Sequence, residues 1–581
     1  MAIVTVLAYA RTRANDALAA QSHVMSTLRA IQIQENEMSI AKSNTNDLAS
    51  LFKEGFFKIP AYQRRYSWGL KQQLDLLNDL NESYQTKSKH FLGTLSVQLI
   101  ETKGFDSIYN LIDGQQRFTT LILLYSCLAN KSRNTTYKDY LKRNNQYFLE
   151  PLNRKEKQFL SDLLDSKPSV PKTISQELML QARDEFNKRI RTFTGNDIDL
   201  FIDHVLNNAI FLVYPVEDYT SSIKMFETIN DRGMPLGYFD KIKSFFLYYS
   251  DKYLNRNIDA DIEQTFDKIY DFFDQKQLLL GINNDSTLIL YHYLSNPVLF
   301  TSWSYTKSTE NIFLDFKKEV LKCSQSSPQE GEKYIKDYLS DICTFIDACL
   351  DIEHKLLTDL KYKEFFLLLN PNQRMFPLSI RFNQIGILDN TIEQLEKIEF
   401  FLKFRRDPKK DIFKILQDSI NFKGPTIDLI NDINNSLYYI YEWQDNAIDI
   451  VNSATWAAKY ALYKINKVEN DQIITPQDYK ELEVEHIFSQ EPSFPIENYG
   501  YDEESYHHLL NNIGNLTLLE KKINGPSGAT NKPPEDKIAT DYLNSNIRMT
   551  QNIKIKNMND VKVRSVEIEK FLNDYFKFEL L

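Results

Sequence analysis

The stretch that decides the fold of the N-terminal half runs Leu111-Ile112-Asp113-Gly114-Gln115-Gln116-Arg117-Phe118-Thr119-Thr120-Leu121. Apolar residues lead into Asp-Gly, and an amphipathic pattern follows at once, which predicts a strand, a tight turn and a helix. Gly114 lets the backbone bend without a clash at a Cβ atom. Such a turn places free backbone N–H groups at the start of a helix, where the helix dipole favours an anion.

Polar side chains follow this turn directly. Gln115, Gln116 and Arg117 put two amides and a guanidinium at the same helix start. A guanidinium can donate to two phosphate oxygens at once, and Asp113 could hold a metal, a water or a ribose hydroxyl. Taken alone, however, the pattern favours a solvated first turn of a helix over an anion site.

Two further segments change that balance. Residues 59–68 read Ile-Pro-Ala-Tyr-Gln-Arg-Arg-Tyr-Ser-Trp, and residues 226–236 read Phe-Glu-Thr-Ile-Asn-Asp-Arg-Gly-Met-Pro-Leu. The three segments carry, in order, the patterns Pro-x-Tyr-Gln-Arg, Asp-Gly-Gln-Gln-Arg and Phe-x-x-x-Asn-x-x-Gly. Residues 38–250 therefore resemble the N-terminal domain of the GmrSD-type modification-dependent restriction endonucleases.

The resemblance implies a ParB/sulfiredoxin-like fold that binds and hydrolyses a nucleoside triphosphate, GTP or another. It implies Arg64 and Arg117 as phosphate ligands. No Walker-type Gly-x-x-x-x-Gly-Lys-Ser/Thr segment occurs, so the chain is not a P-loop NTPase. Without the family patterns, rim packing for Tyr62 and helix capping for Asn230 would be the preferred roles. The other residues implied at the nucleotide site are Tyr62, Gln63, Asp113, Gly114, Gln115, Gln116 and Asn230.

A second chemical segment lies near the C-terminus. Residues 482–490 read Leu-Glu-Val-Glu-His-Ile-Phe-Ser-Gln, and residues 511–519 read Asn-Asn-Ile-Gly-Asn-Leu-Thr-Leu-Leu. We expect a strand that ends near His486, then a tight turn and a second strand at 513–519. A histidine of near-neutral pKa can take a proton from water. Divalent cations that stabilise a departing 3′ oxygen prefer oxygen ligands such as Glu and Asn.

These residues resemble the His-Me finger (HNH-like) nuclease domain at the C-terminus of the same restriction family, over residues 456–543. The resemblance implies that His486 is the general base and that Asn515 organises the loop. It implies a phosphate contact at Lys537 and Mg²⁺ or Mn²⁺ near Glu485 and Asn524, with Asn524 expected to open a helix. Ser489 stands where the family usually has proline, a residue that shapes the turn without reacting.

The composition fits a soluble globular protein, with 42% hydrophobic and 25% charged residues. No run approaches the roughly 20 apolar residues that span a bilayer, and four cysteines without metal-ligand spacing fit a reducing cytoplasm. The net charge of -10 argues against a general nucleic-acid coat protein. A local basic surface stays open at Arg64 and Arg65, or at 403–410, where a solvated loop is slightly favoured.

The predicted fold class is α+β and predominantly helical. Residues 1–37 form an extension of unclear role, and 38–250 form the nucleotide-binding domain. Residues 130–200, within that domain, are polar and predict surface helices. Residues 251–450, with apolar residues at every third or fourth position, predict a helical scaffold. Residues 451–581 complete the chain as a ββα-metal nuclease domain.

The sequence thus predicts a cytoplasmic, nucleotide-dependent endonuclease of antiphage defence that recognises modified DNA and has no membrane partner. Homo-oligomerisation stays open. A first alternative is a nucleotide-switched DNA-binding or adaptor protein with a vestigial nuclease domain, which Ser489 and the acidic net charge would favour. A second alternative is a nuclease toxin that acts on unmodified nucleic acid.

Overall fold

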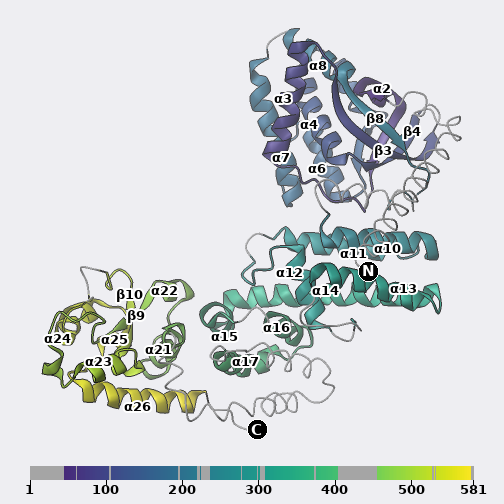
Figure 1. The fold of residues 1–581 in the computed structure, drawn as a ribbon. Coiled ribbons are helices and arrows are strands. Elements are labelled where there is room, and N and C mark those ends of the chain that lie inside the picture. The colour runs from purple at the N-terminus through teal and green to yellow at the C-terminus, as the bar shows by residue number, and fades with distance from the viewer. Residues whose placement is uncertain are drawn as a thin grey trace, which may run out of the picture. The chain divides into compact units, whose positions relative to one another are not determined.

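A computed structural model describes most of the chain, and Figure 1 labels its helices and strands. The chain divides into two compact units. One unit comprises Met1–Asp274 and Ser324–Ile335, and the other comprises Gln275–Cys323 and Lys336–Leu581. The predicted extension 1–37, Asn230 and the basic run 403–410 lie outside the described residues. The described residues are 45–60, 62–103, 106–193, 196–218, 221, 223, 236–275, 278–296, 299–300, 308–371, 375–402, 455–525, 529 and 531–576.

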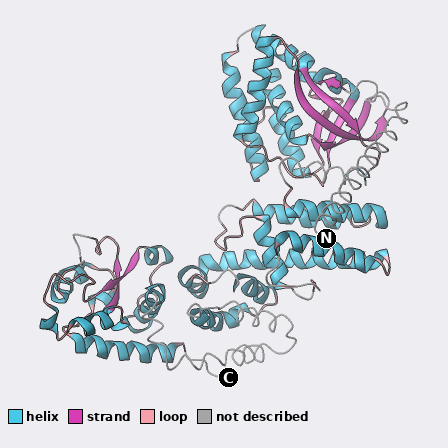
Figure 2. Cartoon of the chain, in the orientation of Figure 1, coloured by secondary structure: helices cyan, strands magenta, loops and turns pink. Residues whose placement is uncertain are grey.

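The first unit is built on a six-stranded mixed sheet with the strand order β1-β8-β3-β4-β2-β7 (Figure 2). The two central strands β3 and β4 pair antiparallel, whereas β8 runs parallel to β3 and β2 runs parallel to β4. The strands are β1 (Thr45–Asp47), β2 (Gly55–Ile59), β3 (His90–Lys103), β4 (Asp106–Asp113), β7 (Leu149–Pro151) and β8 (Ala209–Pro215).

Helices pack beside this sheet around α4, which is buried along almost its whole length. The sheet and these helices share one apolar core, in which the rings of Phe57 and Phe118 lie 5.3 Å apart. The helices of the unit are α2 (Leu48–Glu54), α3 (Leu70–Thr86), α4 (Gln115–Lys131), α5 (Thr136–Asp139), α6 (Arg154–Leu164), α7 (Ile174–Arg189), α8 (Asn196–Asn208), α10 (Tyr238–Leu254) and α11 (Asp259–Phe273).

The predicted strand, turn and helix around Gly114 are confirmed: β4 ends at Asp113 and α4 begins at Gln115. The helices predicted for 130–200 are present, but the stretch also contains strands and is not confined to the surface. β7 pairs there with β2, and both α6 and α7 contribute apolar side chains to the core. The short strands β5 (Lys142–Arg143) and β6 (Gln146–Tyr147) also lie in this stretch.

The second unit begins with helices, as predicted for the middle of the chain, and the described part of 278–402 contains no strand. The predicted boundary at 250 falls inside α10. The helices are α12 (Asp285–Ser295), α13 (Thr309–Ser324), α14 (Pro328–Thr358), α15 (Leu360–Tyr362), η3 (Lys363–Leu369), α16 (Met375–Gln384) and α17 (Leu388–Leu402).

The C-terminal part of this unit holds a two-stranded antiparallel sheet of β9 (Leu482–His486) and β10 (Leu516–Glu520), in which His486 lies opposite Leu516. The two predicted strands are therefore confirmed. The surrounding elements are α21 (Thr455–Glu469), α22 (Pro476–Lys480), η5 (Ile496–Tyr499), α23 (Glu503–Leu510), η6 (Ile513–Asn515), α24 (Pro534–Asp536), η7 (Lys537–Asp541), η8 (Tyr542–Asn544), α25 (Arg548–Gln551) and α26 (Met558–Tyr575).

These elements confirm the predominantly helical α+β class, and the ParB-like and ββα-metal folds stay predictions. In the described part of the chain, helices are too short or too polar to cross a membrane.

Candidate functional site

Two arginines and one carboxylate meet at the turn between β4 and α4. Burial lowers the pKa of both Arg64 and Arg117, and Asp113 opposes that shift in each case. Burial raises the pKa of Asp113, against the Gly114 N–H and the two guanidiniums. Among described residues, neither guanidinium lies within ion-pairing distance of a carboxylate. Asp240 also lies near Arg64 and opposes the lowering of its pKa, whereas Asp113 is the counter-charge that acts on Arg117. Two guanidiniums without a direct ion pair can still donate to an anion.

Two glycines leave room for this cluster. Gly114 has a φ of +87°, and a Cβ there would lie 2.8 Å from the carbonyl oxygen of Thr94. Gly93 on β3 has a φ of +95°, and its Cβ would lie 2.2 Å from Nη1 of Arg117. Sequence reasoning missed Gly93, although a glycine inside a strand often marks the close approach of another group.

The glutamines of the motif hold the neighbouring segment in place. Nε2 of Gln115 donates to the carbonyl of Arg64 at 3.2 Å. Nε2 of Gln116 donates to the carbonyl of Arg65 at 3.2 Å, and its Oε1 accepts from the N–H of Ser67 at 2.7 Å. The predicted ligand amides therefore fasten segment 62–67, which carries Arg64, to the start of α4.

Gln63 and Tyr62 are placed in the same way. Nε2 of Gln63 donates to the carbonyl of Ile112 on β4, and Gln63 is buried. Tyr62 is fully buried. Both side chains therefore join segment 62–67 to the body of the unit. The residues that the sequence motifs named at this site do lie close together. Most of them hold the segment that carries Arg64 in place.

Arg65 turns away from the cluster toward α11. Its guanidinium lies 2.7 Å from Asp274, 3.4 Å from Asp271 and 3.5 Å from Asp267. It also lies over the ring of Tyr270, 5.1 Å from the centroid. Three carboxylates surround this arginine, so it does not provide the basic surface for DNA that the sequence left open.

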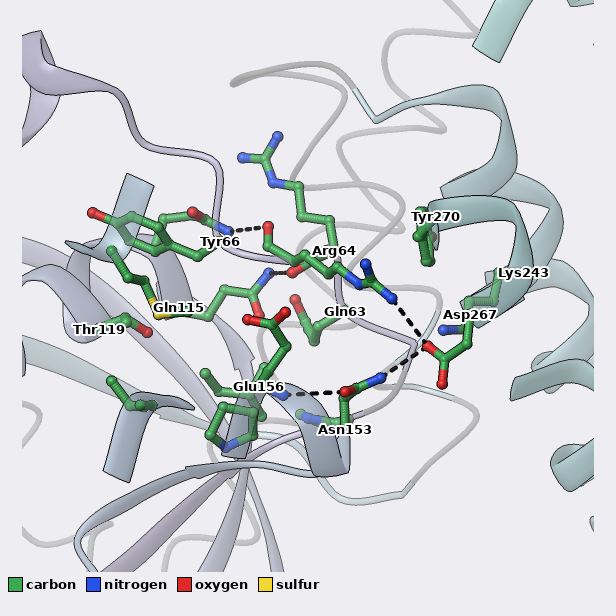
Figure 3. A pocket seen from close by; sticks show the side chains of 17 residues that line it. Gln63, Arg64, Tyr66, Gln115, Thr119, Asn153, Glu156, Lys243, Asp267 and Tyr270 are labelled. Carbon is green, nitrogen blue, oxygen red and sulfur yellow. Dashed lines mark hydrogen bonds and ion pairs between the residues drawn. The ribbon is translucent and has the colours of Figure 1, made fainter. Parts of the chain in front are cut away.

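A cavity of about 60 Å³ separates the arginine segment from α10 and α11 (Figure 3). Lys243 and Asp267 lie on the helix side, opposite Gln63 and Glu156. Ligand pockets usually measure about 300–1,000 Å³, so this cavity cannot contain a nucleotide. Burial lowers the pKa of Lys243 and raises that of Glu156, which marks the cavity as a desolvated, charged interior.

In the C-terminal part, His486 ends β9 and is oriented by Asn511. Nε2 of His486 lies 3.0 Å from Oδ1 of Asn511. Burial lowers the pKa of His486, whereas the hydrogen bond to Asn511 and the charge of Glu485 raise it. The imidazole is consequently neutral at pH 7, the form that can accept a proton. Sequence reasoning did not assign a role to Asn511.

Asn515 ties the two motif segments together. Its Oδ1 accepts from the N–H of Phe488 at 2.8 Å, and its Nδ2 donates to the carbonyls of Phe488 at 3.1 Å and Leu510 at 2.8 Å. Its own carbonyl accepts from the N–H of Ile487 at 2.8 Å. This geometry fits the loop-organising role that the resemblance implied.

Glu485 and Lys537 differ from expectation. Nζ of Lys537 lies 2.6 Å from Oε1 of Glu485 and donates to the carbonyl of His486 at 2.6 Å. Both side chains are buried. Glu485 is buried within β9, where its charge needs a partner. In this structure the pair therefore holds the backbone at His486, and the implied metal and phosphate roles of the two side chains stay predictions.

Asn524 lies in a bend after β10, and most of the residues over which the expected helix would run lie outside the described part of the chain. Its Nδ2 donates to Oε2 of Glu483 at 3.1 Å. Glu483 is an exposed residue of β9 that sequence reasoning did not single out. The described residues contain no group of three or more His, Cys, Asp or Glu side chains that could hold a metal ion. A cation here would depend on few protein ligands.

Ser489 is accommodated at the position where the family pattern has proline. The side chain is buried and its Oγ donates to the carbonyl of Lys532 at 3.2 Å. The carbonyl of Ser489 accepts from the hydroxyl of Tyr506 at 2.6 Å. Hydrogen bonds thus hold the turn after His486 without the ring of a proline.

Comparison with known families gives two matches. Residues 45–247 match the N-terminal domain of the GmrSD restriction endonucleases. Residues 439–571 match the C-terminal domain of the GmrSD restriction endonucleases. No curated protein matches the chain. Both family halves expected from the motifs are confirmed in the expected order, and they support a restriction nuclease that acts on DNA.

Proposed function

The chain belongs to the family of GmrSD restriction endonucleases, and from this premise we propose that it is a nucleotide-dependent endonuclease that cleaves modified phage DNA. The observation that carries the proposal is His486 at the end of β9. Its imidazole is neutral and oriented by Asn511, and Asn515 holds the backbone of the segment that follows it. Restriction acts on incoming DNA inside the cell, so the proposal places the enzyme in the cytoplasm.

The hydrogen bond of His486 determines which nitrogen is the base. Because Oδ1 of Asn511 accepts, Nε2 carries the hydrogen, and the lone pair of Nδ1 is left to accept a proton from water. The water oxygen then attacks phosphorus while its proton moves to Nδ1, and the bond from phosphorus to the 3′ oxygen breaks. The 3′ oxygen leaves with the bonding electron pair and takes a proton from solvent, which gives a 5′ phosphate and a 3′ hydroxyl. Lys537 donates to the carbonyl of His486 and thereby fixes the backbone from which the imidazole extends.

A divalent cation fits the donor set beside this strand. Glu483 and Asn524 carry oxygen ligands of the kind that Mg²⁺ and Mn²⁺ prefer, and their contact places the two side chains together. These residues would hold the cation, which when bound stabilises charge on the departing oxygen. Glu485, the ligand expected from the family pattern, would have to leave Lys537 to join them.

The N-terminal cluster is proposed to bind the phosphates of GTP or another triphosphate. Arg64 and Arg117 supply two guanidiniums, with Asp240 and Asp113 as counter-charges near Arg64 and Asp113 near Arg117. The start of α4 adds backbone N–H groups and the positive end of its dipole. Binding and hydrolysis at this cluster would set when the nuclease domain is allowed to cleave.

A nucleotide-switched adaptor with a vestigial nuclease is the competing function. Ser489 was its main support, and the bonds of Ser489 to Lys532 and Tyr506 weaken that support because the turn is intact. A nuclease toxin would use the same catalytic residues as a restriction enzyme. Only the nucleic acid that it cleaves, unmodified DNA or RNA, would distinguish it.

The test is a nicking assay on matched modified and unmodified phage DNA, with and without triphosphate and Mg²⁺ or Mn²⁺. His486→Ala should abolish nicking, and Arg117→Ala should reduce triphosphate hydrolysis and change nicking. His354→Ala, an exposed histidine on α14, is the matched control and should behave as wild type. Triphosphate hydrolysis through Arg117 without any cleavage would support the adaptor, and cleavage of unmodified DNA or RNA would support the toxin.

A further inference from the structure

Helix α26 contacts the motif turn through one arginine that no sequence pattern singled out. Nη1 of Arg564 donates to the carbonyl of Gly514 at 2.7 Å and to the carbonyl of Leu516 at 2.7 Å. These two carbonyls flank Asn515, the residue that ties the turn to the segment after His486. We propose that Arg564 is a positioning residue that holds His486 in its cleavage-competent orientation, an inference that rests on the proposed nuclease function.

The turn has little freedom to move against α26. A Cβ atom at Gly514 would lie 2.2 Å from the carbonyl oxygen of Val561 and 2.9 Å from the backbone nitrogen of Ser565. The backbone of the turn η6 therefore lies directly on the backbone of α26. Arg564 fastens this contact from the side, so the helix fixes the turn at two independent points.

The turn carries both groups that determine the position of His486. Asn511, just before η6, accepts from Nε2 of the imidazole. Asn515, at the end of η6, holds both backbone groups of Phe488 and the N–H of Ile487. A shift of η6 would consequently weaken the orientation of the ring and of the backbone that follows it.

The cost of burying this guanidinium argues for a specific role. Burial lowers the pKa of Arg564 to about 10, so the group stays charged at pH 7. Its Nη2 is buried and has no hydrogen-bond partner among the described residues. Glu567 and Glu469 offset part of the cost of burying this charge, but neither forms an ion pair with it. A buried charge of this kind often stabilises a fold less well than an apolar side chain of similar size would. What the guanidinium provides is the fixed position of two carbonyls.

The side chain can be replaced from outside by a small molecule. A groove of about 940 Å³ is lined by Arg564 together with Glu469 and Glu567, which lie on α21 and α26. Removal of the guanidinium would leave a space that opens onto this groove, and the two carboxylates would attract a cation. Methylguanidinium is therefore a suitable probe for chemical rescue.

The experiment compares full-length wild type, Arg564→Ala, Arg564→Lys and the control Lys562→Ala, which removes an exposed cation from the same helix. Amide hydrogen exchange is followed at 484–490 and 510–518, and nicking is followed as kcat and KM. We expect Arg564→Ala to exchange about tenfold faster in both segments and to lose at least about tenfold in kcat with KM unchanged.

Methylguanidinium should restore a measurable part of both losses in Arg564→Ala and should change nothing in Lys562→Ala. Should Arg564→Ala fail to fold, Arg564→Lys is read in the same way, with a smaller loss expected. Unchanged exchange at 484–490, or a loss in KM alone, would overturn the inference. The exchange arm needs no cleavage, so a wild type that fails to nick overturns the proposed function and leaves this arm decisive.

Discussion

At His486, burial and a hydrogen bond act on the pKa in opposite directions. Burial lowers the pKa below its usual 6.5, and the contact with Asn511 raises it. Because the folded pKa is lowered, the neutral base persists to pH values below 6.5, and the unfolded chain takes up its proton first as the pH falls. This histidine therefore costs stability below pH 6.5 and none above it.

The acid limb of the pH–rate profile for nicking should accordingly have its midpoint below pH 6.5. Asn511→Ala removes the one hydrogen bond that raises the pKa, so the midpoint should move to still lower pH. The plateau rate should fall by about tenfold, less than the 10²- to 10⁴-fold expected for loss of the base itself. Initial rates from pH 4.5 to 8 test this, and a shift to higher pH would contradict it.

Asn515 is a second residue whose effect can be stated in advance. Asn515→Ala leaves the backbone groups of Phe488 and the carbonyl of Leu510 buried without their partner. We expect a loss of about 2–4 kcal/mol in the free energy of unfolding of the C-terminal part. Denaturant unfolding measures it. Asn559→Ala, at an exposed position on α26, should change it by less than about 0.5 kcal/mol.

The motifs predicted which residues meet but only partly what each does. Arg64 and Arg117 lie together at the turn before α4, and His486 ends β9, while their roles stay predictions. Gln115 and Lys537 instead bind protein atoms, because burial requires their polar groups to find partners nearby. Arg564, Asn511 and Gly93 act through contacts between distant parts of the chain, and a pattern of neighbouring residues carries no information about such contacts.

At the scale of elements, the turn between β4 and α4 depends on the absence of a side chain. Gly114→Ala combines an unfavourable positive φ with contacts at 2.6 Å to Leu95 and 2.8 Å to Thr94. We expect a loss of about 2–4 kcal/mol in stability. Gly386→Ala is the matched control, because its φ is +78° and no atom lies within 4 Å of the new Cβ. It should cost only about 1 kcal/mol.

The segment that carries Arg64 should depend on its fastening to α4. Gln116→Leu removes the bonds to Ser67 and Arg65 without touching either guanidinium of the cluster. We expect triphosphate affinity to fall by about tenfold, because the arginine must then be ordered on binding. Isothermal titration measures it, with Gln158→Leu on the exposed face of α6 as the control. Equal affinity in both variants would show that Gln116 is only packing.

Strands were predictable where apolar residues alternate or run together, as in β3, β4 and β9. β7 was not, because it has only three residues within a polar stretch, and its place is decided by pairing with β2. The two strands lie far apart in the sequence, so a local pattern of residues cannot indicate that they pair. The helical middle was recognised by its period, but the split of α10 across a predicted boundary shows that periodicity does not mark where a domain ends.

For the whole molecule, metal should matter to cleavage and not to folding. The described residues hold no cluster of His, Cys, Asp or Glu that would bind a structural ion. EDTA should therefore stop nicking while the melting temperature of the free protein stays within about 1 °C, because no folding free energy depends on a bound ion. Calorimetry measures the melting temperature and a nicking assay measures cleavage, both on the same sample with and without EDTA. A large drop in melting temperature with EDTA would point to a structural metal.

The backbone passes between the two units three times, at 274/275, 323/324 and 335/336. A gene fragment that stops after residue 274 would encode an incomplete body, in which the hydroxyl of Tyr249 has lost Ser324 and the carbonyl of Pro328. The two compact units are thus not contiguous segments of the chain. A single recombination crossover between relatives would leave at least one unit with segments from two parents, so a whole unit can be exchanged only by more than one crossover or between parents whose segments already match.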